Sequence, residues 1–296
     1  MAQSYKGKII KGIAGFYYVY TKAGIFQCRA RGLFREKGQK PLAGDNVYIE
    51  LTDTEDVEGN VTEILPRKNS LIRPPVANID QAVVIFSIHR PEPVWGLLDR
   101  FLINMSYEGI PALICINKDD LKKDDEEEQI RRIYGGADIK LLFASAMCGT
   151  GIDELKAELY GKTTTVAGPS GAGKSSLINR ILGEARLETG EISRKVERGK
   201  QTTRHTELIP LEKDTFIFDS PGFSSLETAY INKEELRDYY PEFSGYNAEC
   251  RYNLCSHTHE PDCAVKEAVK DGNISAERYN SYLSVYGELN SRKRYR

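Results

Sequence analysis

Apolar and polar residues alternate in the first seventy residues of the chain. In residues 47–51 the odd positions are apolar and the even positions mostly polar, which is the period of a half-buried strand. Residues 16–20 and 25–30 form similar short runs, and glycine-containing turns separate the runs. Several short strands at this spacing predict a small β-barrel.

The pattern changes after two consecutive prolines, Pro74 and Pro75, which interrupt both helices and strand ladders. Short apolar runs then alternate with helical segments, and such runs are typical of strands buried on both faces of a parallel sheet. The predicted strands are residues 82–88, 112–116, 141–144, 163–167 and 216–218. The last seventy residues end in a helical stripe of Tyr279, Tyr282, Tyr286 and Leu289. We therefore expect a barrel domain (1–72), an α/β domain (73–226) and a mostly helical C-terminal domain (227–296).

The composition is that of a soluble globular protein. The 296 residues carry 41 Lys and Arg against 43 Asp and Glu, a formal net charge of −2, and 40% of them are hydrophobic. These values exclude a histone-like basic protein and a largely disordered chain. Six cysteines are too few for a disulfide scaffold, and no apolar run has the length of a signal peptide or a membrane span. We expect a cytoplasmic protein that binds no membrane.

The first chemical motif is the run Gly168-Pro169-Ser170-Gly171-Ala172-Gly173-Lys174-Ser175, followed by Ser176. It fits the phosphate-loop pattern G-x-x-x-x-G-K-[ST] in full and lies between a predicted strand and a predicted helix at 176–182. In such a loop, backbone N–H groups and the helix N-terminus surround the phosphates of a nucleotide. We expect Lys174 to neutralise charge between the β- and γ-phosphates as a catalytic group, and the Ser175 hydroxyl to ligate Mg²⁺.

The second motif identifies the base. Asn117-Lys118-Asp119-Asp120 follows the predicted strand at 112–116, and Ser145-Ala146 follows the strand at 141–144. At the end of a strand, N-K-x-D is the guanine-reading motif of GTPases, because the Asp120 carboxylate accepts hydrogen bonds from two guanine donors that adenine lacks. We expect Asn117 to tie this loop to the phosphate loop and the stem of Lys118 to lie along the base. Ser145-Ala146 resembles the S-A-K element, whose backbone N–H faces guanine O6.

The third motif, Asp219-Ser220-Pro221-Gly222, follows the predicted strand at 216–218. Asp219 is expected to hold Mg²⁺ through a water, and the Gly222 N–H to meet the γ-phosphate. The polar segment at 198–204 stands where a switch segment should be, with Thr203 or Thr202 reaching Mg²⁺ in the triphosphate state.

The order of these motifs is informative. Ordinary GTPases run phosphate loop, switch threonine, D-x-x-G, N-K-x-D and S-A-K, whereas here N-K-x-D and S-A precede the phosphate loop. The same strands can assemble with relocated termini, so the order predicts a circularly permuted G domain. Phe223 stands where many GTPases carry a glutamine that orients the attacking water. Because Phe223 cannot hydrogen-bond that water, we expect slow hydrolysis alone and acceleration by a partner.

A cysteine-rich segment predicts a metal site. Cys250, Cys255, His257 and Cys263 form the pattern C-x₄-C-x-H-x₅-C among polar neighbours. Three thiolates and one imidazole are the donor set of a closed tetrahedral Zn²⁺ site with a structural role, with His259 as the rival to His257. The remaining cysteines, Cys28, Cys115 and Cys148, are expected to be packing residues.

Local charge points to RNA. Residues 1–73 hold 12 Lys and Arg against 8 Asp and Glu, and residues 194–204 hold five against one. Residues 29–40 carry Phe34 among their basic residues, and the tail at 292–296 is also basic. Phosphate attraction and base stacking use these residue types, although short basic runs are often merely solvated.

Taken together, these motifs closely resemble one family, the ribosome small-subunit-dependent GTPases of the RsgA type. The resemblance covers essentially the whole chain and also rests on R-G-L-F-R at 31–35, residues 73–80 and L-D-R-F-L at 98–102. It implies an OB-like barrel, GTP and GDP as ligands, and GTP hydrolysis stimulated by the 30S ribosomal subunit late in its maturation. It also implies contacts of the barrel and zinc domains with 16S rRNA. Many members have His before the threonine pair and use it in hydrolysis; this chain has Gln201, which can still orient water as a catalytic group.

Two other interpretations stay open. One is an RNA-binding protein whose G domain holds nucleotide without useful turnover, which Phe223 and Gln201 would allow. The other is a P-loop ATPase or kinase, against which the motif at 117–120 argues. The favoured interpretation is a GTP hydrolase that acts as a monomer on the 30S subunit and binds no DNA.

Overall fold

The computed structural model describes residues 4–30, 32, 34, 38–54, 57–71, 75–189, 207–212, 214–219 and 230–291. The chain divides into two compact units, each built from three separate segments. The first unit comprises residues 1–82, 156–166 and 178–224, and the second comprises residues 83–155, 167–177 and 225–296. The division into three domains at residues 72 and 226 stays a prediction. Among the described helices, none has both the length and the apolar character needed to span a bilayer.

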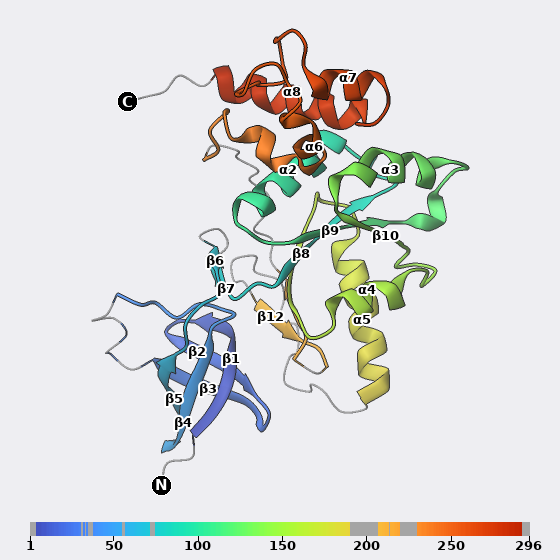
Figure 1. The fold of residues 1–296 in the computed structure, drawn as a ribbon. Helices are drawn as coiled ribbons and strands as arrows, with labels where there is room; N and C mark the ends of the chain where they lie inside the picture. The colour runs from blue at the N-terminus through green and yellow to red at the C-terminus, as the bar shows by residue number, and fades with distance from the viewer. Residues whose placement is uncertain are drawn as a thin grey trace. The chain divides into compact units, whose positions relative to one another are not determined.

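A closed five-stranded barrel begins the first unit (Figure 1). Its strands are β1 (Ser4–Ile13), β2 (Phe16–Thr21), β3 (Gly24–Ala30), β4 (Asn46–Thr54) and β5 (Val57–Ile64). Their order is β1-β2-β3-β5-β4, and every neighbouring pair is antiparallel except β3 with β5. The predicted barrel is thereby confirmed, with the five-stranded architecture of an OB fold.

Local chemistry explains how the barrel forms. Ala14 and Gly15 join β1 to β2 and both have positive φ (51° and 87°), as the two-residue turn that matches the twist of a hairpin requires. The inward residues of the alternating runs form the core, and burying each large one contributes about 1.5–3 kcal/mol. These core residues are Ile9, Val19, Cys28, Phe34, Val47, Ile49, Val61 and Ile64.

A six-stranded sheet has the order β10-β9-β8-β11-β13-β12. Its strands are β8 (Gln81–Ser87), β9 (Ala112–Asn117), β10 (Lys140–Ala144), β11 (Thr163–Ala167), β12 (Glu207–Pro210) and β13 (Phe216–Asp219). β9 pairs in parallel with β10 and β11 with β13, while β12 is an antiparallel edge strand. β8 and β11 are buried at every residue, as strands covered on both faces are. The five predicted strands are confirmed, and β12 is an addition.

The barrel and the far strands of the sheet touch within the first unit. Lys8 on β1 donates from Nζ to Thr163 Oγ1 at 3.2 Å and lies 5.3 Å from the centre of the Phe216 ring. Lys11 pairs with Glu207 of β12 at 3.2 Å. Between the barrel and β8, a short hairpin of β6 (Ser70–Leu71) and β7 (Val76–Ala77) flanks the two prolines.

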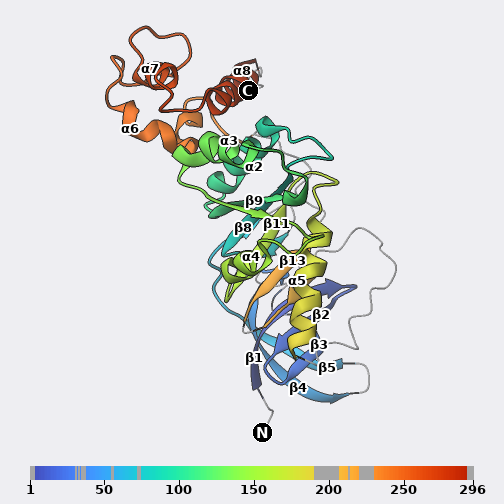
Figure 2. The same cartoon turned by 90° about the vertical axis from the view of Figure 1, so that its right-hand side faces the viewer.

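The second unit contains helices from both its α/β part and its C-terminal part. They are α2 (Trp95–Tyr107), α3 (Glu126–Tyr134), α6 (Ser244–Asn247), α7 (Ala264–Lys270) and α8 (Ala276–Ser291), with the short turns η1 (Asp119–Leu121), η2 (Gly135–Ala137), η3 (Leu236–Tyr239) and η4 (Pro241–Phe243). α8 packs against α2 and α3 (Figures 1 and 2). Tyr282 and Leu289 of the predicted stripe on α8 are buried. Two further helices, α4 (Ile152–Leu159) and α5 (Lys174–Thr189), have residues in both units.

Candidate nucleotide site and candidate metal centre

The predicted phosphate loop runs from the end of β11 into the first turn of α5, which begins at Lys174. Gly168 has φ of +135°, and a Cβ added to it would lie 2.0 Å from the carbonyl oxygen of Ile85. Only glycine fits there, since this approach is far inside van der Waals contact. Ser170, Ser175 and Ser176 are exposed. The loop therefore has a fixed backbone and an open polar face.

Lys174 folds back over this loop. Its Nζ donates to the carbonyl oxygens of Gly168 at 2.8 Å and Pro169 at 2.7 Å. An ammonium group has three N–H donors and needs acceptors, which phosphate oxygens also supply. The side chain is thus held at the mouth of the loop.

Asn117 joins the phosphate loop to the predicted base-reading loops. Its Nδ2 donates to the Ala172 carbonyl oxygen at 2.8 Å, and its Oδ1 accepts a hydrogen bond from the Ala146 N–H at 3.3 Å. The residue is 2% exposed. Because a buried amide that loses a partner costs about 1–3 kcal/mol, both bonds constrain the loops strongly. The structure therefore brings the three predicted segments together within the second unit.

Lys118 and Asp120 flank that amide. Lys118 has left-handed backbone (φ +64°), and its Nζ donates to the Gly171 carbonyl oxygen at 2.9 Å and to that of Arg90. Asp120 is exposed and its carboxylate accepts a hydrogen bond from the buried Ser145 hydroxyl. Asp119 instead pairs with Lys122 at 3.1 Å, so it faces its own turn. An exposed carboxylate beside the Asn117 bridge suits recognition of two guanine donors.

The switch residues lie largely outside this description. Asp219 ends β13, and its backbone alone is described. Gln201, Thr202, Thr203, Gly222 and Phe223 lie outside the described residues, as do the basic tail and much of the run at 31–35. Their predicted roles stay predictions.

One loop at the site has no sequence signature. Residues 88–94 connect β8 to α2, and the ring of Pro91 lies beside Gly171, with its Cδ 3.3 Å from where a Cβ on that glycine would be. The Ile88 N–H donates to the Asn117 carbonyl oxygen at 2.9 Å. Because these contacts involve main-chain atoms and ring edges, no pattern of side chains in the sequence predicts them.

The predicted metal ligands converge. The donor atoms of Cys250, Cys255, His257 and Cys263 all lie within 4.8 Å of one another, and all four residues are buried. His257 Nδ1 lies 3.6 Å from Cys250 Sγ and 3.4 Å from Cys263 Sγ, and the two sulfurs are 4.0 Å apart. A zinc tetrahedron has sulfur–sulfur edges of about 3.8 Å and sulfur–nitrogen edges of about 3.6 Å. His259, the rival ligand, is exposed and hydrogen-bonds to the Thr258 hydroxyl.

The chemistry of this donor set fits a dication. Burial lowers the pKa of His257 to about 4, so the imidazole is neutral at neutral pH, the form that binds a metal. Burial raises the pKa of Cys255 to about 12, because a thiolate without a nearby cation is unfavourable there. A bound Zn²⁺ supplies the missing positive charge and would tie the loop at 250–263 together.

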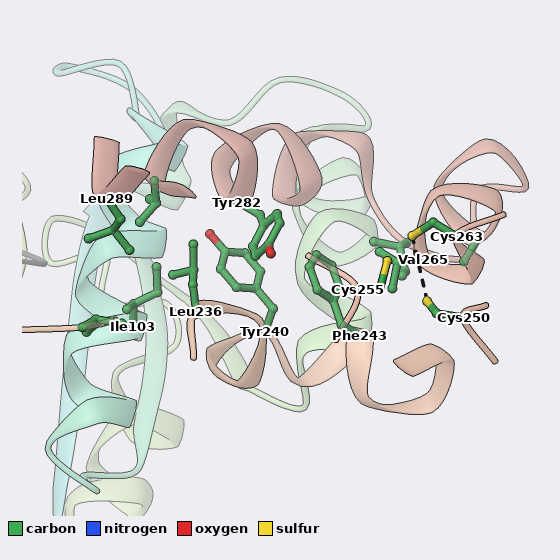
Figure 3. Packing of buried hydrophobic residues seen from close by; sticks show 14 residues of the cluster. Ile103, Leu236, Tyr240, Phe243, Cys250, Cys255, Cys263, Val265, Tyr282 and Leu289 are labelled. Carbon is green, nitrogen blue, oxygen red and sulfur yellow. Dashed lines mark hydrogen bonds between the residues drawn. The ribbon is translucent and has the colours of Figure 1, made fainter. Parts of the chain in front are cut away.

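The cluster lies at one end of a hydrophobic core. In Figure 3, Phe243 and Tyr282 lie between the cysteines and Ile103 of α2. Tyr279 and Tyr282 on α8 donate from their hydroxyls to the carbonyl oxygens of His257 (2.7 Å) and Ser256 (2.5 Å). The predicted helical stripe therefore supports the metal loop directly.

Cys28 and Cys115 are buried as expected, but the prediction for Cys148 is wrong, because that residue is exposed. It lies in the loop after Ser145, where its N–H donates to the serine hydroxyl at 3.1 Å and its side chain is left outside.

A buried ion cluster, unforeseen from the sequence, connects α8 to α2. Arg278 is 1% exposed; its Nη1 donates to Asp99 at 2.5 Å, and its Nε and Nη2 donate to the Glu242 carboxylate at 2.7 and 3.1 Å. The Tyr134 hydroxyl also donates to Asp99, at 3.1 Å, and the Tyr240 ring centre lies 4.6 Å from the guanidinium carbon. The guanidinium thus fastens the C-terminal helix to the α/β part of the second unit.

A phosphate loop that follows the N-K-x-D strand in the chain, with Asn117 bridging the two, defines a circularly permuted P-loop GTPase. The family model for the RsgA GTPase matches residues 64–229, and that for the RsgA N-terminal domain matches residues 6–59. The chain belongs to the RsgA GTPase family and is a GTP hydrolase.

Relatives are similar over nearly the whole chain. A protein of Agathobacter rectalis named small ribosomal subunit biogenesis GTPase RsgA is 51% identical over 300 residues, covering 98% of this chain and 99% of that protein. The crystal structure of YjeQ from Thermotoga maritima superposes with a TM-score of 0.82 at 33% identity, covering 98% of this chain and all of that one. The crystal structure of YloQ, described as a circularly permuted GTPase, gives 0.79 at 37% identity, covering 98% of this chain and 96% of that one.

Proposed function

We propose that the chain hydrolyses GTP to GDP and phosphate on the 30S ribosomal subunit, as a late factor in the biogenesis of that subunit. The observation that carries the proposal is the near-complete, 51% identical alignment with a relative named small ribosomal subunit biogenesis GTPase RsgA. The 30S subunit then stimulates hydrolysis, and the protein acts in the cytoplasm as a monomer that contacts 16S rRNA and binds no DNA.

The nucleotide site assigns roles to the described residues. Asp120 reads guanine, and the N–H of Ala146 meets its O6. Asn117 holds these loops in register with the phosphate loop through the Ala172 carbonyl. Lys174 exchanges the carbonyls of Gly168 and Pro169 for phosphate oxygens when nucleotide enters.

Hydrolysis needs further groups. Ser175 and Thr203 are the proposed Mg²⁺ ligands, with Asp219 holding the ion through a water, and a bound Mg²⁺ would neutralise developing charge on the phosphates. Gly222 offers its N–H to the γ-phosphate, and Gln201 orients the attacking water in place of the glutamine that Phe223 replaces. With one neutral side chain for this task, turnover is slow until the subunit supplies further polar groups.

An exposed arginine on the barrel supports the contact with rRNA. Arg29 on β3 is exposed, and its guanidinium carbon lies 4.8 Å from the centre of the Phe16 ring on β2. A cation held flat on an aromatic ring presents charge for phosphate together with a surface for base stacking.

GTP turnover with and without purified 30S subunits tests the proposal. We expect strong stimulation by the subunit; unchanged turnover refutes the ribosomal part and favours an RNA-binding protein that merely holds nucleotide. The guanine assignment is tested by Asp120→Asn, which should exchange preference from GTP to xanthosine triphosphate. Asp124→Asn, an exposed carboxylate in the following loop, is the matched control and should keep GTP preference.

A further inference from the structure

His89, in the β8–α2 loop, is held between two carboxylates. Its Nδ1 lies 3.0 Å from Glu92 Oε1 in the same loop, and its Nε2 lies 3.0 Å from Glu126 Oε2 at the start of α3. The His89 side chain is only 13% exposed. The ring therefore bridges the loop and the helix.

Both bonds require the doubly protonated ring. Neutral imidazole has one N–H, so one nitrogen would turn a lone pair toward a carboxylate. Hydrogen bonds with Glu92 and then Glu126 raise the pKa of His89, and burial opposes them only in part. The imidazolium is the form that the geometry selects.

Few other charges face this ring. From the segment before α3, the Lys123 N–H donates to Glu126 at 2.7 Å, and the charge of Lys123 also favours the ionised Glu126 carboxylate. Lys118, directly before η1, contacts the residue next to His89, because its ammonium donates to the Arg90 carbonyl oxygen. Among the residues that the structure describes, the ring thus faces two anions and no cation in direct contact.

The loop that His89 holds is a wall of the nucleotide site. Arg90 adopts left-handed backbone (φ +52°), a conformation that a non-glycine residue keeps only when its surroundings impose it. In that conformation its carbonyl oxygen shares the Lys118 ammonium with the carbonyl oxygen of Gly171 in the phosphate loop. The position of Lys118 therefore depends on the loop.

We propose that His89, as an imidazolium, is a positioning residue for guanine-nucleotide binding, because it fixes the β8–α2 loop whose Arg90 carbonyl holds Lys118 against the phosphate loop. This inference rests on the proposed nucleotide site. The two hydrogen bonds from His89 to Glu92 and Glu126, which we call the His89 clamp, set the sign of the pH dependence. Both are present below the raised pKa of His89, and one is lost as pH rises through that pKa. Affinity for nucleotide therefore falls with rising pH by this contribution.

The test compares GDP dissociation constants of the full-length wild type and His89→Gln, measured by calorimetry from about pH 6 to pH 9, a range that spans the titration of a histidine. Glutamine donates to one carboxylate, as neutral histidine does, so we expect about two- to fivefold weaker binding at pH 6, the range of a partly exposed ion pair. The ratio of the two constants should approach one at pH 9. Taking the ratio removes the titration of GDP itself, which is common to both proteins.

A second variant guards against a folding defect. Glu126→Gln keeps an acceptor for the Lys123 N–H but removes the anion. Its GDP dissociation constant should also exceed that of the wild type at pH 6 and approach it at pH 9. Arg132→Gln, which removes an exposed charge from the same helix, should match the wild type at every pH. Wild-type protein that fails to bind GDP overturns the proposed nucleotide site. If the wild type binds GDP normally but the ratio of variant to wild-type dissociation constants does not change with pH for either His89→Gln or Glu126→Gln, the role of His89 alone is overturned.

Discussion

The buried cluster around Arg278 makes a quantitative prediction for Arg278→Met. Methionine preserves most of the side-chain volume but leaves Asp99 and Glu242 without their common cation. Removing one partner of a buried ion pair costs about 3–5 kcal/mol, because the remaining charge is stranded in a low-dielectric interior. Here two carboxylates are stranded, at 1% exposure for Asp99, so the upper part of that range applies.

Asp99→Asn is the matched variant. The asparagine oxygen still accepts from the Tyr134 hydroxyl, and Arg278 keeps its two bonds to Glu242. The cluster then changes from a formal charge of −1 to 0, so the loss should be only about 1–3 kcal/mol, that of a weakened buried hydrogen bond. Charge pairing therefore predicts a clear ranking of the two variants.

The only tryptophan of the chain reports on this region. Trp95 begins α2, and its ring centre lies 6.0 Å from that of Tyr134. Urea unfolding followed by Trp95 fluorescence should show the midpoint for Arg278→Met lowered by about 1.6–2 M, using a dependence of about 2.5 kcal/mol per molar urea.

Two outcomes contradict this reasoning. A midpoint for Arg278→Met within about 0.3 M of wild type would mean that the cluster contributes under about 1 kcal/mol. Equal losses in the two variants would mean that packing, and not charge, holds α8 to α2.

Two further predictions concern the sites themselves. Gly168→Ala should abolish nucleotide binding measured by calorimetry, because its Cβ would lie 2.0 Å from the Ile85 carbonyl oxygen; binding within threefold of wild type would contradict the fixed backbone of the loop. Elemental analysis should find one zinc per chain in the purified wild type and none in Cys255→Ser, and the variant's C-terminal core should unfold at a lower temperature, since structural zinc contributes folding free energy directly. The control Cys148→Ser, an exposed cysteine, should keep one zinc per chain, and retention of zinc by Cys255→Ser would remove that residue from the ligand set.

Sequence patterns predict those parts of the molecule in which side chains carry the signal. Alternation marks the barrel strands, and the spacing of Cys250, Cys255, His257 and Cys263 anticipates a cluster whose donor atoms lie within 4.8 Å. The hydrogen bond from Asn117 to the phosphate loop joins residues 55 positions apart. The sequence still predicts it, because the chemistry of guanine recognition requires it.

Other features have no such signal. Arginine is rarely buried, so nothing in the pattern of α8 distinguishes Arg278 from a solvated residue until Asp99 and Glu242 are seen around it. The β8–α2 loop meets Lys118 through a main-chain carbonyl, which every residue possesses. Cysteines lie in the interior on average, but the loop after Ser145 turns Cys148 outward.

The separation of Asp99 and Arg278 along the chain also determines when their ion pair can form during translation. The two residues are 179 positions apart, so at about 5–20 residues per second the arginine is made about 10–40 s after the aspartate. Throughout that interval α2 exists with a carboxylate whose counter-ion has not been synthesised. The emerging chain must keep Asp99 hydrated, and the second unit closes only when its last helix leaves the exit tunnel.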